Sequence, residues 1–141
     1  MTSEKFKIMS EFVKDMSSET PDIQTYLIVK DTIPKYHLDI EINSKPLKDK
    51  IIEVNTLVKF SDKDSSAKKA NFEITYASII KIENEIKDKK DLQKIILCDV
   101  QNQIYPRLEK AFLDMITNSG YPGVKFSKKI DFEKLYEEKF N

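Results

Sequence analysis

The sequence predicts an α+β fold: a four-stranded antiparallel sheet with a long, kinked helix and a short C-terminal helix packed on one face. Segments in which every second residue is apolar, the period of a half-buried strand, recur up to residue 82. Segments with apolar residues at helical spacing follow from residue 91 onward. Strands first and helices last is the element order of an α+β domain, in which the helices gather on one face of the sheet.

The first strand is predicted for residues 6–19, and Pro21 ends it. Strict alternation would place Phe6, Ile8 and Phe12 on one side and Lys7, Met9, Glu11 and Val13 on the other. Residues 22–33 are largely apolar although they should form a connection, and two interpretations stay open. Either residues 25–30 form a further short strand, because they are rich in β-forming side chains, or the segment is a long apolar loop laid across the surface.

Three more strands follow, at residues 36–42, 51–60 and 70–82, joined or followed by polar and charged segments at residues 61–69 and 83–91. The first of these three has the cleanest alternation of apolar and polar residues in the chain. The side chains expected to face inward are Tyr36, Leu38, Ile40, Ile42, Ile52, Val54, Val58, Phe60, Phe72, Ile74, Tyr76, Ile80 and Ile82. On the last strand, the residues expected to face outward are Glu73, Thr75, Ala77 and Ile79.

A kinked or two-piece helix is predicted for residues 91–118, with Pro106 in a first turn, where a missing N–H costs least. Gly120 then supplies a stop, because glycine adopts the left-handed turn that ends many helices. After a short extended piece at residues 124–126, Asp131 is a good N-cap for a last helix. The residues on one side of that helix are Phe132, Leu135 and Tyr136.

The predicted sheet has more apolar surface than its helices can cover. The helices lie on one face, yet the third and fourth strands carry apolar residues on both sides. A monomer does not usually expose such a surface. The other face or an edge of the sheet should therefore meet a partner subunit or a client chain.

Composition restricts the class of protein. At 141 residues, the chain is expected to form a single domain over residues 1–141 with its own core. Its 24 basic and 24 acidic residues cancel, which argues against a nucleic-acid footprint. No apolar run is long enough for membrane insertion, and the first residues lack a signal-peptide core. The single cysteine, Cys98, fits a reducing compartment, so a cytoplasmic location is expected.

No enzyme motif is found. The single histidine, His37, is expected on the outward side of a strand, in contact with solvent, rather than as a general base. Cys98 lies in an apolar helical stretch and is expected to be a buried small residue. The two residues cannot supply the usual four ligands of a zinc site, and two glycines cannot build a phosphate loop. We therefore expect no catalysis, no metal and no cofactor. An enzyme with a cleft that uses these two residues, and a purely structural oligomer, remain as alternatives.

Four motifs resemble the bacterial protein-export chaperone SecB family. They are K-D-M-S-S-E-T-P at residues 14–21, P-K-Y-H-L-D-I-E-I at residues 34–42, Y-P-R-L-E-K with M-I-T-N-S-G-Y-P-G-V within residues 105–124, and I-D-F-E-K-L-Y at residues 130–136. They follow the family's order at compatible spacings and together cover most of the chain.

The resemblance implies a homo-oligomer, a dimer of dimers, with sheet edges paired within each dimer and the long helices packed between dimers. It also implies an ATP-independent holdase that keeps unfolded preproteins from folding and hands them to the SecA motor. The family's client groove lies between the sheet, the loop from the first to the second strand, and the last helix. Carried over to this chain, the expected client-binding residues are Ile23, Tyr26, Leu27, Ile33, Tyr121, Phe132, Leu135 and Tyr136. The expected SecA-binding residues, on the flat face of the sheet, are Asp15, Glu19, Glu73 and Thr75.

This sequence departs from the family at the SecA contact. Thr75 stands where the family has a third acid, although Glu73, on the same face, would partly replace it. Ser18 stands where an aromatic residue is usual. The chain is neutral and stops at Asn141, whereas the family is commonly acidic with a polar tail. These departures fit the alternative function, a SecB-like chaperone dedicated to the antitoxin of a toxin–antitoxin system.

Overall fold

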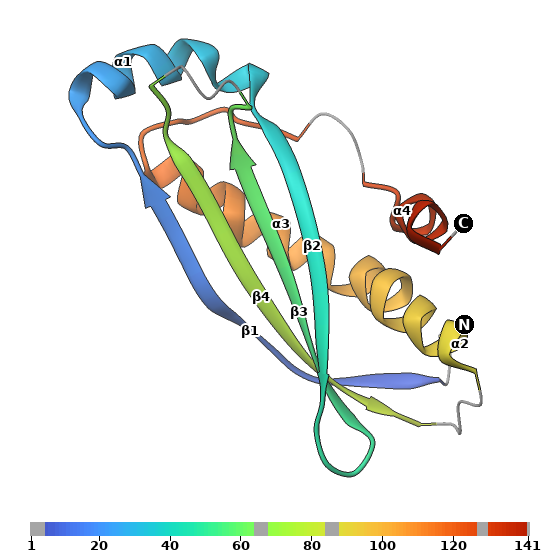
Figure 1. The fold of residues 1–141 in the computed structure, drawn as a ribbon. Helices are drawn as coiled ribbons and strands as arrows, with labels where there is room; N and C mark the ends of the chain where they lie inside the picture. Colours follow the sequence, from blue (N-terminus) through green and yellow to red (C-terminus); the bar gives the residue numbers. More distant parts are fainter. Residues whose placement is uncertain (1–4, 64–67, 84–87, 127–129, 141) are drawn as a thin grey trace.

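The four strands form one antiparallel sheet, as the sequence predicts. The computed structural model describes residues 5–63, 68–83, 88–126 and 130–140. The strands are β1 (Phe6–Glu19), β2 (His37–Pro46), β3 (Ile51–Ser61) and β4 (Asn71–Ile82), in the spatial order β1-β4-β3-β2. The helices and turns are α1 (Ile23–Thr32), a 3-10 turn (Ile33–Lys35), α2 (Lys89–Lys94), a π-helical segment (Ile95–Asp99), α3 (Val100–Asn118) and α4 (Phe132–Phe140). The long helix α3 lies behind one face of the sheet, and α1 lies across one end of it (Figure 1).

The core lies between the sheet and α3. Residues at every second position of β3 and β4 point to this inner face, where Val58 pairs with Ile74 and Phe60 pairs with Phe72. The side of α3 that meets them carries Ile104, Leu108, Phe112 and Ile116, spaced four residues apart and fully buried. We call the opposite side of the sheet, which carries Asn55, Leu57, Thr75 and Ala77, the outer face.

Strand β1 does not alternate as predicted, because it contains two bulges. The register against β4 shifts between Ile8 and Ser10 and again between Val13 and Asp15. Each extra residue reverses the sides of those that follow. The strand continues in register after the first bulge with Phe12 opposite Ala77 on the outer face. The expectation that Phe12 shares a side with Phe6 and Ile8 is therefore wrong.

The first bulge turns Glu11 to the inner side, where it joins β1 to α3. Arg107 donates from Nε and Nη2 to the two carboxylate oxygens of Glu11, at 2.6 and 2.7 Å. The Tyr76 hydroxyl donates to the same carboxylate. The hydrogen bond from Arg107 holds the pKa of Glu11 below its ordinary value. This two-pronged ion pair fixes the edge strand against the helix layer.

Residues 23–32 form the helix α1, so both interpretations of this segment, strand and loop, are wrong. Asp22 caps the helix, and its side chain accepts a hydrogen bond from the Thr25 backbone N–H at 2.7 Å. Thr25, Val29 and Ile33 are buried at successive spacings of four residues. Apolar side chains on the remaining sides of the helix hide this stripe, so the 3.6-residue period is weak in the sequence.

The irregularity in the long helix lies earlier than predicted. The π-helical segment Ile95–Asp99 separates α2 from α3. Pro106 lies inside α3 rather than in a first turn, so that expectation is wrong. A buried side-chain pair sits next to the π-helical segment. Gln101 donates to the Ile96 carbonyl at 3.2 Å and accepts from the Thr56 hydroxyl at 2.8 Å.

The last helix begins as predicted. Asp131 accepts from the Lys134 backbone N–H at 3.1 Å, so it is the N-cap of α4. Phe132 is buried, and its ring meets that of Tyr105 edge-on, with centroids 5.5 Å apart. Residues 124–126 have no regular secondary structure. Residues 64–67 and 84–87, within the predicted polar connections, lie outside the described part of the chain.

Candidate functional site: an apolar groove along the sheet edge

A groove of about 1170 Å³ runs along the edge strand β2. Its walls come from the 3-10 turn, the first half of β2, residues 122–126 and α4. The apolar lining residues are Ile33, Pro34, Tyr36, Leu38, Ile40, Phe60, Pro122, Val124, Phe126, Ile130 and Leu135. Strand β2 is the last in the sheet order, so its outer backbone edge faces no other strand among the described residues. The groove thus combines apolar side chains with a free strand edge, which can accept an extended chain.

An aromatic cluster forms the deep wall of the groove. The rings of Phe60 and Phe126 meet edge-on at 5.3 Å, and Tyr36 packs on Phe60 at 5.2 Å. The Tyr36 hydroxyl donates to the Ala70 carbonyl at 2.9 Å and accepts from the Ala70 backbone N–H at 3.0 Å. Burial raises the pKa of Tyr36, because it disfavours the charged phenolate. The wall is therefore neutral, and its polar atoms are already paired.

The rim of the groove is charged with both signs. The charged lining residues are Lys30, Asp39, Lys125, Asp131, Lys134 and Glu138. Equal numbers of acids and bases give the rim no net preference for an acidic or a basic ligand. Selectivity in this groove would come from apolar contact, which is non-directional and does not depend on a particular sequence.

The structure brings two of the eight predicted client-binding residues, Ile33 and Leu135, into the groove. Ile23 and Leu27 are exposed on α1 but are not among the residues that line it. Leu38, Ile40, Val124 and Phe126 line it and are missing from the predicted set. Alternation along β2 was a signal that could have identified the first two of these, because it marked a half-buried strand.

Four of the predicted client residues make contacts within the subunit. The rings of Tyr26 and Tyr121 pack at 5.3 Å, and the Tyr26 hydroxyl donates to the Gly120 carbonyl. Phe132 is buried against α3, and the Tyr136 hydroxyl donates to the Lys90 carbonyl at 3.2 Å. Gly120 has a φ of +103°, and an added Cβ would come within 3.0 Å of the Tyr26 ring. Glycine is therefore required at this turn.

The predicted SecA-binding residues lie together on the outer face. Asp15 pairs with Thr75 across β1 and β4, and Glu19 follows four residues after Asp15 on the same side. Glu73 lies beside Thr75 on β4, and its carboxylate is 3.6 Å from the ammonium of Lys59. Asp15 and Glu19 are exposed, and the other two residues are half-buried. The groove lies along β2, which is the edge strand on the opposite side of the sheet from β1.

Comparison with known proteins assigns the family. The family model of preprotein translocase subunit SecB matches residues 1–141. A putative protein-export protein SecB from Pelagibacter ubique (strain HTCC1062) is 58% identical over 139 residues, which are 99% of each chain. The chain belongs to the SecB family.

More distant SecB proteins match over most of their length as well. The protein-export protein SecB of Methylocella silvestris is 25% identical over 133 residues, 94% of this chain and 81% of that protein. A SecB-like chaperone of Mycobacterium tuberculosis, solved with a ChAD peptide of the HigA1 antitoxin, has the same fold. Its TM-score is 0.61 at 9% identity, over 89% of this chain and 91% of that one. SecB membership makes this chain a chaperone of protein export.

His37 and Cys98 differ in their exposure to solvent. His37 is exposed and lines the groove, whereas Cys98 is fully buried and does not line it. Burial raises the pKa of the Cys98 thiol, which disfavours the reactive thiolate. Among the residues that the structure describes, no three His, Cys, Asp or Glu side chains are grouped to hold a metal ion. Within the same residues, no helix is long and apolar enough to span a membrane.

Proposed function

We propose that this SecB protein is an ATP-independent holdase that binds unfolded preproteins in the cytoplasm and delivers them to SecA. The observation that supports it most is the apolar groove along β2. Burial of client side chains there supplies a binding free energy that needs no nucleotide. The free edge of β2 offers backbone hydrogen bonds, which any unfolded chain can use whatever its sequence.

The predicted client residues have different parts in this proposal. Ile33 and Leu135 contact the client directly in the groove. Ile23, 67% exposed, and Leu27, 51% exposed, extend the apolar surface over α1. The packed residues Tyr26, Tyr121, Phe132 and Tyr136 support the groove walls.

Substitution in the groove tests client binding. We expect Leu135→Asp to weaken binding of a permanently unfolded, fluorescently labelled polypeptide by about tenfold or more, because burial of a leucine side chain contributes about 1.5–3 kcal/mol. Fluorescence anisotropy measures the dissociation constant. The matched control is Leu47→Asp, since Leu47 is 44% exposed, Leu135 is 43% exposed, and Leu47 lies outside the groove. Equal dissociation constants for the two variants would remove the groove from the proposal.

Delivery to SecA is proposed to use the outer face. We expect the Asp15→Ala/Glu19→Ala variant to bind SecA about tenfold more weakly, because surface charges complementary to a partner contribute to both association rate and affinity. Surface plasmon resonance at two salt concentrations measures the effect. The Glu133→Ala/Glu137→Ala variant removes the same charge from α4 and should bind as the wild type does. No measurable binding of the wild type to its cognate SecA would exclude the export role.

The outer edge of β1, which pairs with no other strand among the described residues, supports assembly into a dimer of dimers. Strand β1 is the first in the sheet order, and it carries the exposed side chains Met9, Phe12, Val13 and Met16. A strand edge without a partner, flanked by apolar side chains, is a ready site for pairing with another copy. We propose that two copies pair here and that α3 lies between dimers. Light scattering after size exclusion would give the number of subunits.

A second candidate function is a chaperone dedicated to one antitoxin. The likeness to the fold of a chaperone solved with an antitoxin peptide favours it, as do the zero net charge and Thr75 on the outer face. Rescue of a single unstable antitoxin, without any effect on general unfolded clients, would distinguish this function from export.

A further inference from the structure

A shallow hollow lies in the middle of the outer face. Its volume is about 320 Å³, and the residues that line it are Lys14, Asp15, Asn43, Asn55, Leu57 and Thr75. They come from all four strands of the sheet. The hollow is distinct from the client groove, with which it shares no lining residue.

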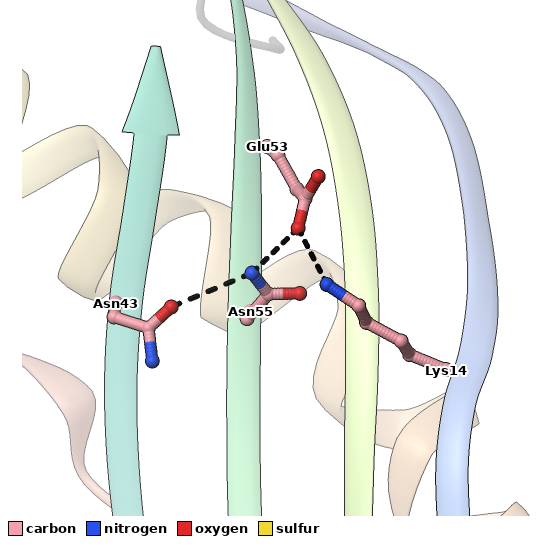
Figure 2. A network of polar contacts seen from close by, with 4 residues as sticks. All are labelled: Lys14, Asn43, Glu53 and Asn55. Carbon is pink, nitrogen blue, oxygen red and sulfur yellow. Dashed lines mark hydrogen bonds and ion pairs between the residues drawn. The ribbon is translucent and has the colours of Figure 1, made fainter.

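Asn55 has a buried carbonyl oxygen without a donor. The side chain is 9% exposed, and its Nδ2 donates to Glu53 at 2.7 Å and to the Asn43 carbonyl oxygen at 3.4 Å. Its Oδ1 accepts no hydrogen bond from the part of the chain that the structure describes. In Figure 2 this oxygen points away from Asn43, toward β4 and β1. A buried acceptor that lacks a donor is costly, so a ligand that supplies one gains binding free energy.

Lys14 is the basic residue among those that line the hollow, and its ammonium is paired with Glu53. It is the extra residue of the second bulge in β1, and such bulges redirect side chains. Its side chain crosses over β4 to reach Glu53 on β3, with an N–O distance of 2.9 Å (Figure 2). The side chain of Lys14 is 49% exposed, so it can move aside. In the free protein Lys14 therefore neutralises Glu53 and covers the hollow.

The remaining polar groups of the hollow are suited to a cation. Asp15 lines the hollow, and its side chain has no hydrogen bond or ion pair with the residues that the structure describes. Together with the Asn55 oxygen it offers a negative charge and a neutral acceptor. Both residues lie on the outer face, where Asp15 pairs with Thr75 of β4 and Asn55 pairs with Ala77 of β4. A guanidinium or ammonium group can donate to both acceptors at once.

We propose that this hollow binds an arginine or lysine side chain of the protein that docks on the outer face, and that Lys14 moves off Glu53 to admit it. Lys14 thus occupies the site in the free protein as an internal competitor. This inference rests on the proposed docking of SecA on this face, and it adds the chemistry of the contact. It follows that Asn55 strengthens partner binding, whereas Lys14 weakens it.

A small arginine compound tests the chemistry without SecA. N-acetyl-arginine methylamide is titrated into the full chain labelled with ¹⁵N-asparagine, and the side-chain amide signals of Asn43 and Asn55 are followed. We expect a saturable shift that the citrulline analogue does not produce. Lys14→Met should lower the apparent dissociation constant several-fold, and Asn55→Leu should abolish saturation at Asn43. Absence of a saturable shift, or saturation unchanged in Asn55→Leu, would overturn the inference.

SecA binding provides the second readout. We expect Asn55→Leu to weaken it and Lys14→Met to strengthen it, each by about fivefold, in line with the net contribution of one hydrogen bond. Asn118→Leu, an exposed position on α3, is the control and should change nothing. SecA that binds all three variants like the wild type overturns the inference but leaves the proposed function. Saturation by the arginine compound without any SecA binding supports the cation site and contradicts the SecA role.

Discussion

We expect the Phe72→Ala variant to lose about 3–5 kcal/mol of its free energy of unfolding, the range for removing a buried phenylalanine side chain. Phe72 is 1% exposed, and its ring packs against Tyr36, Phe60 and Tyr121 at centroid distances of 6.4, 6.2 and 5.5 Å. The cavity would lie behind the deep wall of the groove. Urea unfolding at one fixed protein concentration measures the loss, because association changes the apparent stability.

The same change should also reduce client affinity. Phe60 and Tyr36 line the groove, and both lose a packing partner when the Phe72 ring is removed. Leu47→Ala is the control, because Leu47 is 44% exposed and lies outside both the groove and β1, so its loss should cost less than about 1 kcal/mol. Equal losses of stability in the two variants would mean that the aromatic cluster does not hold the groove wall.

The Gln101→Leu variant is expected to lose about 2–3 kcal/mol of its free energy of unfolding, since it removes two hydrogen bonds and leaves a buried hydroxyl unpaired. Gln101 is fully buried, and its side chain joins the Thr56 hydroxyl on β3 to the Ile96 carbonyl in the π-helical segment. It is the polar connection between the sheet and the irregular part of the helix layer. Urea unfolding at fixed concentration again gives the measurement.

A double-mutant cycle measures the interaction energy between Gln101 and Thr56. Thr56→Val replaces the buried hydroxyl with an apolar group of similar shape. In the Gln101→Leu/Thr56→Val variant no hydroxyl is left unpaired, so the combined loss should be smaller than the sum of the two single losses. Additive losses would show that the two side chains do not depend on each other.

The periodicity of apolar residues in the sequence was sufficient to predict the sheet and the residues on its inner face. Val58 and Ile74 are buried where alternation places them, because β3 and β4 are central strands and run without bulges. It failed for β1, since a bulge is a backbone irregularity that leaves no mark in a two-residue pattern. It also failed for α1, where Ile23, Leu27 and Ile28 are exposed and so obscure the buried side.

The candidate site was only partly predictable for a related reason. The family resemblance predicted that Asp15 and Thr75 share one face, and the structure places them opposite each other. The groove needs tertiary information, because Val124 and Phe126 reach it from a segment without regular structure. The hollow at Asn55 depends on where Lys14 reaches, and this follows from the second bulge.

The two bulges of β1 cancel each other's effect on which face of the sheet the later side chains occupy. Ser10 to Val13, between them, is the only stretch of the strand in the opposite phase, and the second extra residue restores the original phase from Asp15 onward. Loss of either bulge alone would turn Asp15 and Glu19 inward toward α3, whereas loss of both would leave these acids outside. The two irregularities are therefore expected to be kept or discarded together as the protein diverges.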